Sequence, residues 1–266
     1  QTGRDEIVVD DSPENLYARI EEIVTSSDTN FIKAKYNLTD TSGWSLSQFK
    51  KTTLSKSCIK PIWYKPFDQK YIYYEPNALK RDRRKEAKSI IPGDNISLIA
   101  MRQYAYEVPS FCYILCSKFL IPDRFFISNK GTPYFFPLYI YPEPTTQTTF
   151  SQNERTPNLN VAIVDKISQK IGLQFTHEKE PTPATFAPID LFDYIYAVLH
   201  SPTYRETYKE FLKIDFPCVP YPKDAATFWA LVALGGQLRQ AHLLEGPALD
   251  KPLTQYPEDG DNVVRK

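Results

Sequence analysis

The stretch between residues 64 and 74 interleaves aromatic and cationic side chains and predicts β-strands. Its sequence is Tyr64-Lys65-Pro66-Phe67-Asp68-Gln69-Lys70-Tyr71-Ile72-Tyr73-Tyr74. Aromatic and β-branched residues favour the extended backbone of a sheet. A basic run follows closely, with the sequence Lys80-Arg81-Asp82-Arg83-Arg84-Lys85. Cations of this density beside a strand are typical of a surface that meets nucleic acid, because they neutralise phosphates.

The region around this stretch, from 57 to 142, is rich in Tyr, Phe and Ile and is divided by Pro, Gly and Asn. Such a pattern predicts several short strands. We expect strands at 59–64, 71–74, 96–102, 113–116, 124–128 and 134–141, with a helix near 83–91. Residues 142–157 are polar and rich in Pro, Thr and Gln, which predicts a linker or a long loop.

Both ends of the chain have helical patterns instead. Ser12 before Pro13 is a capping signal for a first helix, and a second, short helix is expected at 45–54. Beyond the linker, apolar residues recur at helical spacing over 160–171, 188–200 and 225–244, and Ser201 precedes one more helix. Aromatic residues in this part also recur at helical spacing, which favours a buried core over a ligand site. They are Phe192, Tyr196, Tyr204, Tyr208, Phe211, Phe216, Tyr221, Phe228 and Trp229.

These patterns predict an α+β fold in which a mixed, strand-rich region precedes a helical subdomain. Four segments are expected along the chain. They are an N-terminal helical connector at 1–56, a strand-rich region with its linker at 57–157, a helical subdomain at 158–245 and a flexible tail at 246–266.

Charge is segregated along a chain that is neutral as a whole. Its 32 Lys and Arg residues balance 32 Asp and Glu residues, which excludes a uniformly basic protein. Residues 1–30 hold two basic and eight acidic side chains, whereas residues 50–90 hold twelve basic and four acidic ones, a net charge of +8. This asymmetry is typical of a protein with one side facing a polyanion, although a charge run is often only a solvated face.

The cysteines favour structural roles and a reducing compartment. The chain has Cys58, Cys112, Cys116 and Cys218 but no C-x-x-C pair, and its three histidines have no zinc-site spacing. Free, buried thiols predict a cytoplasmic protein. No apolar run is long enough to predict a membrane span. Because the chain begins at Gln1 without a signal-peptide pattern, we expect a piece cut from a longer protein.

Two predicted strand ends carry side chains that suit base edges. Arg102 and Gln103 end one strand, and Arg pairs with guanine O6 and N7 while Gln pairs with adenine N6 and N7. Asn129 and Lys130 end another, although all four can equally serve local pairing and a hairpin turn. Phosphate contacts are expected from cations between residues 65 and 88. These are Lys65, Lys70, Arg81, Arg83, Arg84, Lys85 and Lys88.

Sequence motifs of catalysis are missing. There is no G-x-G-x-x-G, no P-loop and no G-x-S-x-G elbow. Asp68-Gln69-Lys70 matches the D-x-K end of a metal-dependent nuclease motif, but so short a pattern is more often a surface ion pair. We therefore expect neither a catalytic residue nor a metal site.

The 64–74 stretch resembles the Y-R-P-F-D-x-R-x-x-Y signature in the C-terminal specificity regions of bacterial restriction–modification enzymes, the Type ISP and Type IIG adenine-specific DNA methyltransferases. Lys65 and Lys70 stand where that signature has Arg, which removes the bidentate geometry of a guanidinium. Further landmarks follow the family's order over roughly residues 1–245. They are Thr2-Gly3-Arg4-Asp5, Asp40-Thr41-Ser42-Gly43-Trp44, Arg83-Arg84-Lys85-Glu86, Arg102-Gln103, the stretches 136–142, 190–205 and 211–217, and Phe228-Trp229.

The resemblance implies a target-recognition domain that reads a short duplex DNA sequence. It implies a methyltransferase domain on the same polypeptide, with S-adenosylmethionine as the cofactor there and endonuclease activity in some relatives. The Asp/Asn-Pro-Pro-Tyr loop and glycine-rich motif of that methyltransferase are absent from this sequence, so we expect no cofactor and no catalysis in this chain. Two rival functions stay open: a stand-alone metal-dependent nuclease that uses Asp68 or Glu75, and a protein-interaction module.

Overall fold

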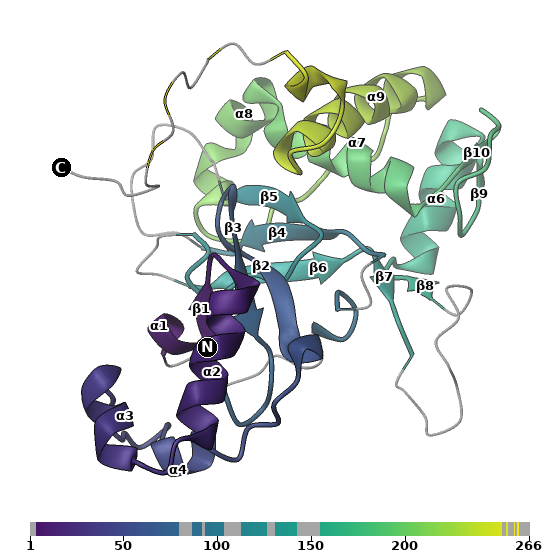
Figure 1. Ribbon diagram of the computed structural model, residues 1–266. Coiled ribbons are helices and arrows are strands. Elements are labelled where there is room, and N and C mark those ends of the chain that lie inside the picture. The colour runs from purple at the N-terminus through teal and green to yellow at the C-terminus, as the bar shows by residue number, and fades with distance from the viewer. Residues whose placement is uncertain are drawn as a thin grey trace.

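The structure, a computed structural model, describes residues 4–79, 87–91, 94–103, 113–126, 131–142 and 155–251, together with 254, 258 and 260. Its two three-stranded sheets lie between two groups of helices (Figure 1), and the α+β class is confirmed. The elements up to β3 are α1 (Asp5–Val8), β1 (Val9–Asp10), α2 (Pro13–Thr25), α3 (Thr29–Lys35), α4 (Leu46–Phe49), η1 (Lys56–Cys58), β2 (Ile59–Lys65) and β3 (Asp68–Tyr73). The later strands are β4 (Ser97–Met101), β5 (Ile114–Ser117), β6 (Pro133–Pro137), β7 (Tyr139–Ile140), β8 (Thr156–Pro157), β9 (Gln174–Phe175) and β10 (Thr185–Phe186). The later helices are α6 (Val161–Ile171), α7 (Pro188–His200), α8 (Pro202–Leu212), α9 (Ala225–His242) and η3 (Pro247–Leu249).

The N-terminal helices pack on a three-stranded antiparallel sheet with the order β1-β3-β2. Ser12 caps α2, as its sequence predicts, because its hydroxyl accepts a hydrogen bond from the backbone N–H of Asn15. Leu16, Ile20 and Ile23 on one face of α2 are fully buried in this first hydrophobic cluster. The cluster includes Tyr73 of β3, so the hairpin is part of the N-terminal core.

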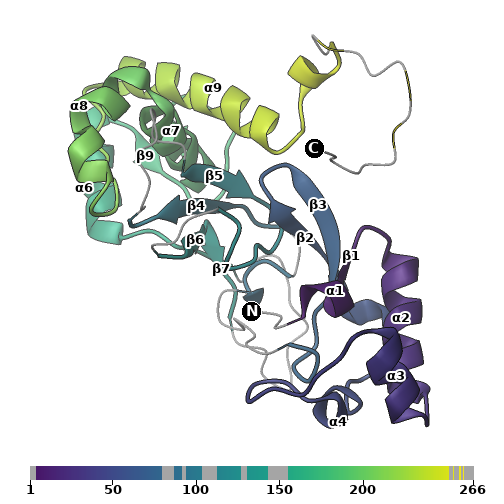
Figure 2. The ribbon, with the colours of Figure 1, turned by 90° about the vertical axis from the view of Figure 1, so that its left-hand side faces the viewer.

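A second antiparallel sheet, with the order β5-β4-β6, carries the helices α7 and α9 on one face (Figure 2). Three helices in this part have N-cap residues of types that favour this position: Asn160 for α6, Ser201 for α8 and Asp224 for α9. The sequence predicts the helix start at Ser201. A second, larger hydrophobic cluster joins this sheet to the helices and reaches Trp63 of β2. The β2–β3 hairpin therefore contributes to both clusters.

Helices α7 and α9 approach each other closely because α9 carries a glycine at the contact. A Cβ atom built on Gly235 would lie 1.9 Å from the carbonyl oxygen of Asp193 on α7. Beside this contact, Arg239 of α9 donates to both carboxylate oxygens of the buried Asp193, at 2.6 and 3.1 Å. The pair of helices thus forms a tightly packed unit over the sheet.

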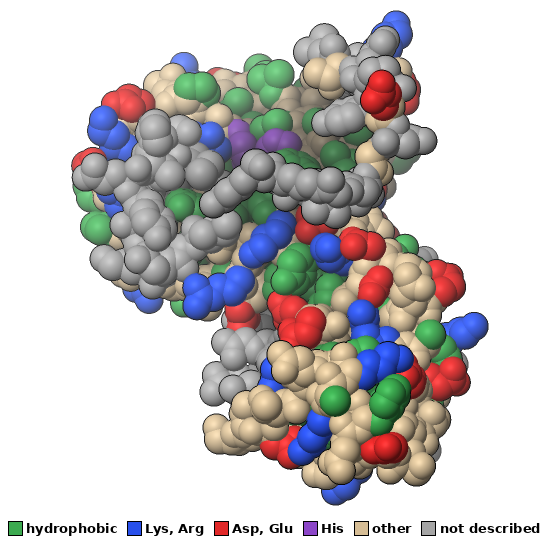
Figure 3. Space-filling view, turned by 60° about the vertical axis from the view of Figure 1, so that its left-hand side comes forward, with side chains coloured by type: hydrophobic (Ala, Val, Ile, Leu, Met, Phe, Trp, Pro, Cys, Tyr) green, Lys and Arg blue, Asp and Glu red, His purple; other side chains and the backbone are tan. Residues whose placement is uncertain are grey.

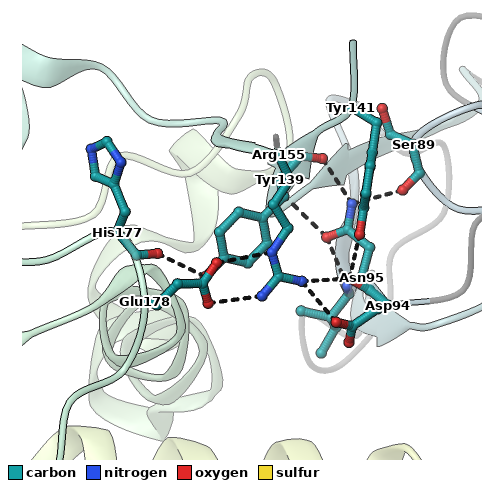
Figure 4. Close-up of polar contacts among 9 residues, drawn as sticks. Ser89, Asp94, Asn95, Tyr139, Tyr141, Arg155, His177 and Glu178 are labelled. Atoms are coloured by element: carbon teal, nitrogen blue, oxygen red, sulfur yellow. Dashed lines mark hydrogen bonds and ion pairs between the residues drawn. The ribbon is translucent and has the colours of Figure 1, made fainter. Parts of the chain in front are cut away.

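A polar joint ties β7 and β8 to their neighbours (Figure 4). Arg155 donates to the carboxylate of Glu178 at 3.0 and 2.8 Å and to the backbone carbonyl of Asp94 at 2.8 Å, and its guanidinium lies 4.0 Å from the centroid of the Tyr139 ring. The buried amide of Asn95 donates to two backbone carbonyls, those of Ser89 and Tyr139, each at 2.7 Å. The joint fixes the end of the 142–157 segment, whose residues 143–154 lie outside the described part.

Two predicted strands differ from the structure. Residues 124–126 form a turn and bend rather than a strand, because the rings of Phe125 and Phe126 both enter the core instead of alternating between two faces. The strand predicted at 134–141 is interrupted at the buried Leu138, so that β6 pairs with β4 while β7 pairs with β8. Helix α3, capped by Asp28, was not predicted. Most of the helix predicted at 83–91 lies outside the described residues.

The prediction that the late aromatics are all core is wrong for three exposed rings and holds only in part for two half-buried ones. Phe211 is 69% exposed, and Tyr208 and Tyr221 are also exposed. Phe216 and Trp229 are half-buried, and Trp229 packs against the larger hydrophobic cluster. Helix α8 buries only Tyr204 and Leu212, so its other aromatic positions face solvent. Among the cysteines, Cys116 is buried as expected, but Cys58 is half-buried and Cys218 is exposed, while Cys112 lies outside the described residues. None of the described helices has the length and apolar character to cross a bilayer. The boundaries of the four predicted segments stay predictions.

Candidate nucleic-acid interface

The β2–β3 hairpin holds both of its predicted phosphate-binding lysines close to one tyrosine ring. The ammonium nitrogens of Lys65 and Lys70 each lie 5.6 Å from the centroid of Tyr64. Lys70 also forms an ion pair of 3.0 Å with Asp11, and Lys65 donates to the backbone carbonyl of Arg124. Burial and the neighbouring Asp5 raise the pKa of Tyr64 to about 12, so its hydroxyl stays protonated and donates to Asp5 at 2.8 Å. The lysines are thus ordered, partly paired cations.

The turn of this hairpin is Pro66-Phe67, the centre of the 64–74 stretch. Phe67 has a φ of +64°, a conformation that is uncommon for a bulky residue and that Pro66 before it favours in a turn. Its exposed ring lies 6.0 Å from the centroid of Trp63 and 5.9 Å from that of His242 on α9. The turn therefore links the hairpin directly to the helical part.

Two histidines meet where α7 and α9 end. The ring centroids of His200 and His242 lie 5.3 Å apart, and Tyr196 contacts both: its hydroxyl is 2.6 Å from His242 Nδ1, and its backbone carbonyl accepts from His200 Nδ1 at 2.9 Å. Burial lowers the pKa of His200 to about 4, and the cation of Arg205 acts in the same direction. The pKa of His242 is lowered for the same two reasons. Both rings are neutral at pH 7 and supply no charge for phosphate.

We expect acid to destabilise the protein through His200. In the unfolded chain the pKa of His200 is near 6.5, whereas in the folded protein it is about 4. As the pH falls, the unfolded state therefore binds a proton at a higher pH than the folded state does. Stability is then lost as the pH falls through this window, by about 3 kcal/mol, since one pKa unit is worth about 1.4 kcal/mol. Urea unfolding at pH 7, 5.5 and 4 should give a shallower decline for His200→Asn than for the wild type. Equal declines in the two proteins would contradict the prediction.

The end of β4 brings the two predicted base readers to the surface next to aromatic rings. Arg102 and Gln103 are both exposed and follow directly on Met101, the last residue of the strand. Across the ladder, Tyr134 and Phe136 of β6 lie with their rings stacked 6.3 Å apart, and the ring of Phe216 packs against both at 4.8 and 5.6 Å. Tyr134 and Phe136 are exposed, so apolar rings and polar readers share one surface.

The other predicted contacts are distributed differently. Lys88 is half-buried in the turn at 87–91 and takes part in an interaction there. Six predicted contacts lie outside the described residues. They are Arg81, Arg83, Arg84, Lys85, Asn129 and Lys130. On the face shown in Figure 3, the molecule is hollowed between an upper and a lower part, and Lys and Arg side chains lie there among Asp and Glu side chains.

The loop that follows α8 lies in the family landmark at 211–217, but sequence reasoning assigned it no contact with the predicted base readers. Asp215 forms an ion pair with Arg102, its Oδ1 lying 2.8 Å from Nε, and the carbonyl of Ile214 accepts from Gln103 at 3.3 Å. These partners lie more than one hundred residues along the chain from the strand end that they contact. The signals available were this landmark and the polar Asp215 between Ile214 and Phe216, and neither identifies a partner.

Asp68 and Glu75, the acidic residues that the rival nuclease function would use, have structural positions in the fold. The carboxylate of Glu75, which is buried, accepts from the backbone N–H groups of Asn77 and Ala78 at 2.7 and 3.2 Å. Asp68 begins β3 opposite Lys65. Within the described part of the chain, no three His, Cys, Asp or Glu side chains are grouped as a metal ion would need.

A family model of the Type ISP C-terminal specificity domain matches residues 1–266, the whole chain. The chain belongs to this family. Among curated protein sequences, none matches the specificity domain. Its fold is similar to that of three solved structures, which share 20–23% of its residues in the matched parts.

The first similar structure is a cryo-EM complex of DrdV with DNA, with a TM-score of 0.61, 23% identity and 91% of the specificity domain covered. The second is LlaBIII, an ATP-dependent Type ISP restriction–modification enzyme bound to DNA, with a TM-score of 0.66, 20% identity and 92% covered. The third is a nuclease-deletion mutant of LlaGI, a Type ISP restriction–modification enzyme, in complex with a DNA substrate mimic (0.57, 22%, 91%). The match spans 22%, 15% and 21% of those chains, respectively.

Proposed function

We propose that this specificity domain recognises a short sequence in double-stranded DNA. The observation that carries the proposal is the end of β4, where Arg102 and Gln103 project from a rigid sheet beside exposed rings. These two side chain types pair with guanine and adenine in the major groove. Membership of a specificity-domain family and similarity to three DNA-bound enzymes support the same function.

Within this proposal, the contacts divide into two classes. Arg102, Gln103, Asn129 and Lys130 approach base edges, and seven cations contact phosphates and add affinity without specificity. The seven are Lys65, Lys70, Arg81, Arg83, Arg84, Lys85 and Lys88.

The proposal extends to the longer protein. A methyltransferase domain on the same polypeptide binds S-adenosylmethionine and methylates adenine in the sequence that this domain selects, while this domain itself holds no cofactor and performs no catalysis. The family resemblance and the small share of each similar enzyme that the chain spans support this arrangement. Incubating the chain with plasmid DNA and Mg²⁺ tests the rival: we expect intact DNA, whereas cleavage would establish a nuclease.

We expect the basic run to set the salt dependence of binding. The double variant Arg83→Ala with Arg84→Ala should bind all duplexes more weakly, and its slope of log affinity against log salt should flatten by about 0.9 for each lost phosphate contact. Fluorescence anisotropy with a labelled duplex, titrated at several salt concentrations, measures this slope. Lys35→Ala is the matched control, since Lys35 lies on α3 in an ion pair with Glu22 and should not change the slope. An unchanged slope in the double variant would remove these arginines from the interface.

A further inference from the structure

The loop after α8 holds both predicted base readers at the end of β4. Oδ1 of Asp215 accepts two hydrogen bonds of 2.8 Å, one from Arg102 Nε and one from the backbone N–H of Phe216. The backbone carbonyl of Ile214 accepts from the side chain amide of Gln103. Phe216 fixes the loop to the sheet, because its ring packs on Tyr134 and Phe136 of β6.

These contacts leave free the atoms that base recognition uses. Arg102 is held through Nε, its side chain is 53% exposed, and no described residue bonds its Nη1 or Nη2. The two terminal nitrogens form the fork that can donate to guanine O6 and N7. For Gln103, the bond to Ile214 uses one amide hydrogen, and the second hydrogen and Oε1 are the donor and acceptor that adenine N7 and N6 require.

We propose that Asp215 is a positioning residue for base recognition: it orients the guanidinium of Arg102 toward a guanine, so that the helical part of the chain sets specificity through the loop at 214–216. The proposal rests on the proposed DNA recognition. An arginine has many rotamers, and holding one of them before binding lowers the entropy that ordering the side chain costs. The second bond to Asp215, from the Phe216 backbone, keeps the carboxylate itself in place.

Because Asp215 is charged, its removal should change DNA affinity and base discrimination in opposite directions, which the removal of a purely structural residue would not do. The negative charge of the Asp215 carboxylate repels phosphates and offsets the positive charge of Arg102. Removing this carboxylate should therefore strengthen binding to DNA of any sequence. The same removal lets the guanidinium rotate and should weaken discrimination. The ion pair is exposed on both sides and therefore contributes little to folding. Opposite changes in affinity and discrimination are not expected from partial unfolding.

The test selects duplexes from a pool with a randomised central segment, using the 266-residue chain, and sequences the bound fraction. The wild type should enrich a motif that contains a guanine, and Arg102→Ala should lose the preference at that position. Arg102 remains in Asp215→Ala, so this variant should weaken the same preference by about threefold, less than the roughly tenfold loss of the whole bidentate pair in Arg102→Ala. Its affinity for a scrambled duplex, measured by anisotropy at low salt, should rise.

Two further variants separate orientation from charge. Asp215→Asn keeps an oxygen that can accept from Arg102 Nε, so it should retain most of the preference while its affinity for the scrambled duplex rises as in Asp215→Ala. Glu210→Ala removes a carboxylate from α8 that pairs with Lys213, and it should leave the motif unchanged. Thermal melts of all variants accompany the binding data.

The outcomes are distinct. If the wild type enriches no motif, the proposed function fails, and the positioning role fails with it. If the wild type enriches a motif and Asp215→Ala keeps the guanine preference, the function stands and the positioning role is overturned. A loss of preference at every position with a lowered melting temperature overturns it too, because Asp215 would then be structural. A selective loss at the Arg102 position, with stronger non-specific binding, supports the proposal.

Discussion

Gly235→Ala is expected to destabilise the protein by about 3 kcal/mol or more, at the upper end of what overpacking costs. The new methyl group would meet the carbonyl oxygen of Asp193 at 1.9 Å, its carbonyl carbon at 2.7 Å and Cβ of Ala197 at 3.2 Å. Since two of these atoms belong to the backbone of α7, no rotamer change relieves the clash. The helices must separate, and the Arg239–Asp193 pair beside the contact is strained as they do.

The neighbouring glycine provides the control. A Cβ atom on Gly236 meets side-chain atoms, Oδ2 of Asp193 at 3.1 Å and Nη2 of Arg239 at 4.0 Å, rather than backbone, so Gly236→Ala needs only a small adjustment. Alanine is also favoured over glycine in a helix interior by about 1 kcal/mol. Urea unfolding should therefore place Gly236→Ala near the wild type and Gly235→Ala far below it. Equal midpoints for the two variants would mean that α7 and α9 are not in contact at Gly235.

Phe228→Ala is expected to cost about 3–5 kcal/mol, the usual cost of truncating a buried phenylalanine. Phe228 is fully buried, and the centroid of its ring lies 5.5 Å from that of Phe186 and 5.5 Å from that of Tyr194. Truncation removes these contacts and leaves a cavity in the cluster that joins the helices to the β5-β4-β6 sheet.

Trp229 next to it provides the comparison. Its ring is half-buried and lies 4.7 Å from the ammonium nitrogen of Lys179. Trp229→Ala should cost less than half as much as Phe228→Ala in a thermal or urea melt, with DNA affinity retained by folded protein. If Trp229→Ala were the more damaging change, the ranking of the two positions by burial would be wrong. Lost DNA binding with a native-like melt would make Trp229 a contact residue.

Local sequence chemistry predicted the helices well because each carries its own signals. Ser12, Asn160 and Ser201 cap helices at the residues where an apolar stripe begins, and capping depends on neighbours within the same turn. The positions of the strands were harder to predict from the sequence. Phe125 and Phe126 have the composition of a strand, but the cluster around Trp63 takes both rings and the backbone turns instead. Tertiary packing, which a local pattern does not contain, decided that segment.

The candidate site shows the same limit. Arg102 and Gln103 could be nominated from residue type at a predicted strand end, whereas their partners could not, because Asp215 and Ile214 arrive from the far end of the sequence through the packing of Phe216 on β6. The exposed Phe211 and Tyr208 were assigned to the core because helical spacing does not tell how many sides of a helix are covered.

The β2–β3 hairpin, which contributes to both hydrophobic clusters, affects how the protein unfolds. Tyr73 of β3 belongs to the N-terminal cluster and Trp63 of β2 to the larger one, and Trp63 donates its backbone N–H to the carbonyl of Leu120 at 2.9 Å. Neither cluster can lose its order without exposing strands of the same ladder, so we expect one cooperative transition in which the amides of β2 and β3 exchange with solvent as slowly as those of β4. A base reader at the end of β4 and a phosphate contact on the hairpin would then keep a constant separation along the duplex.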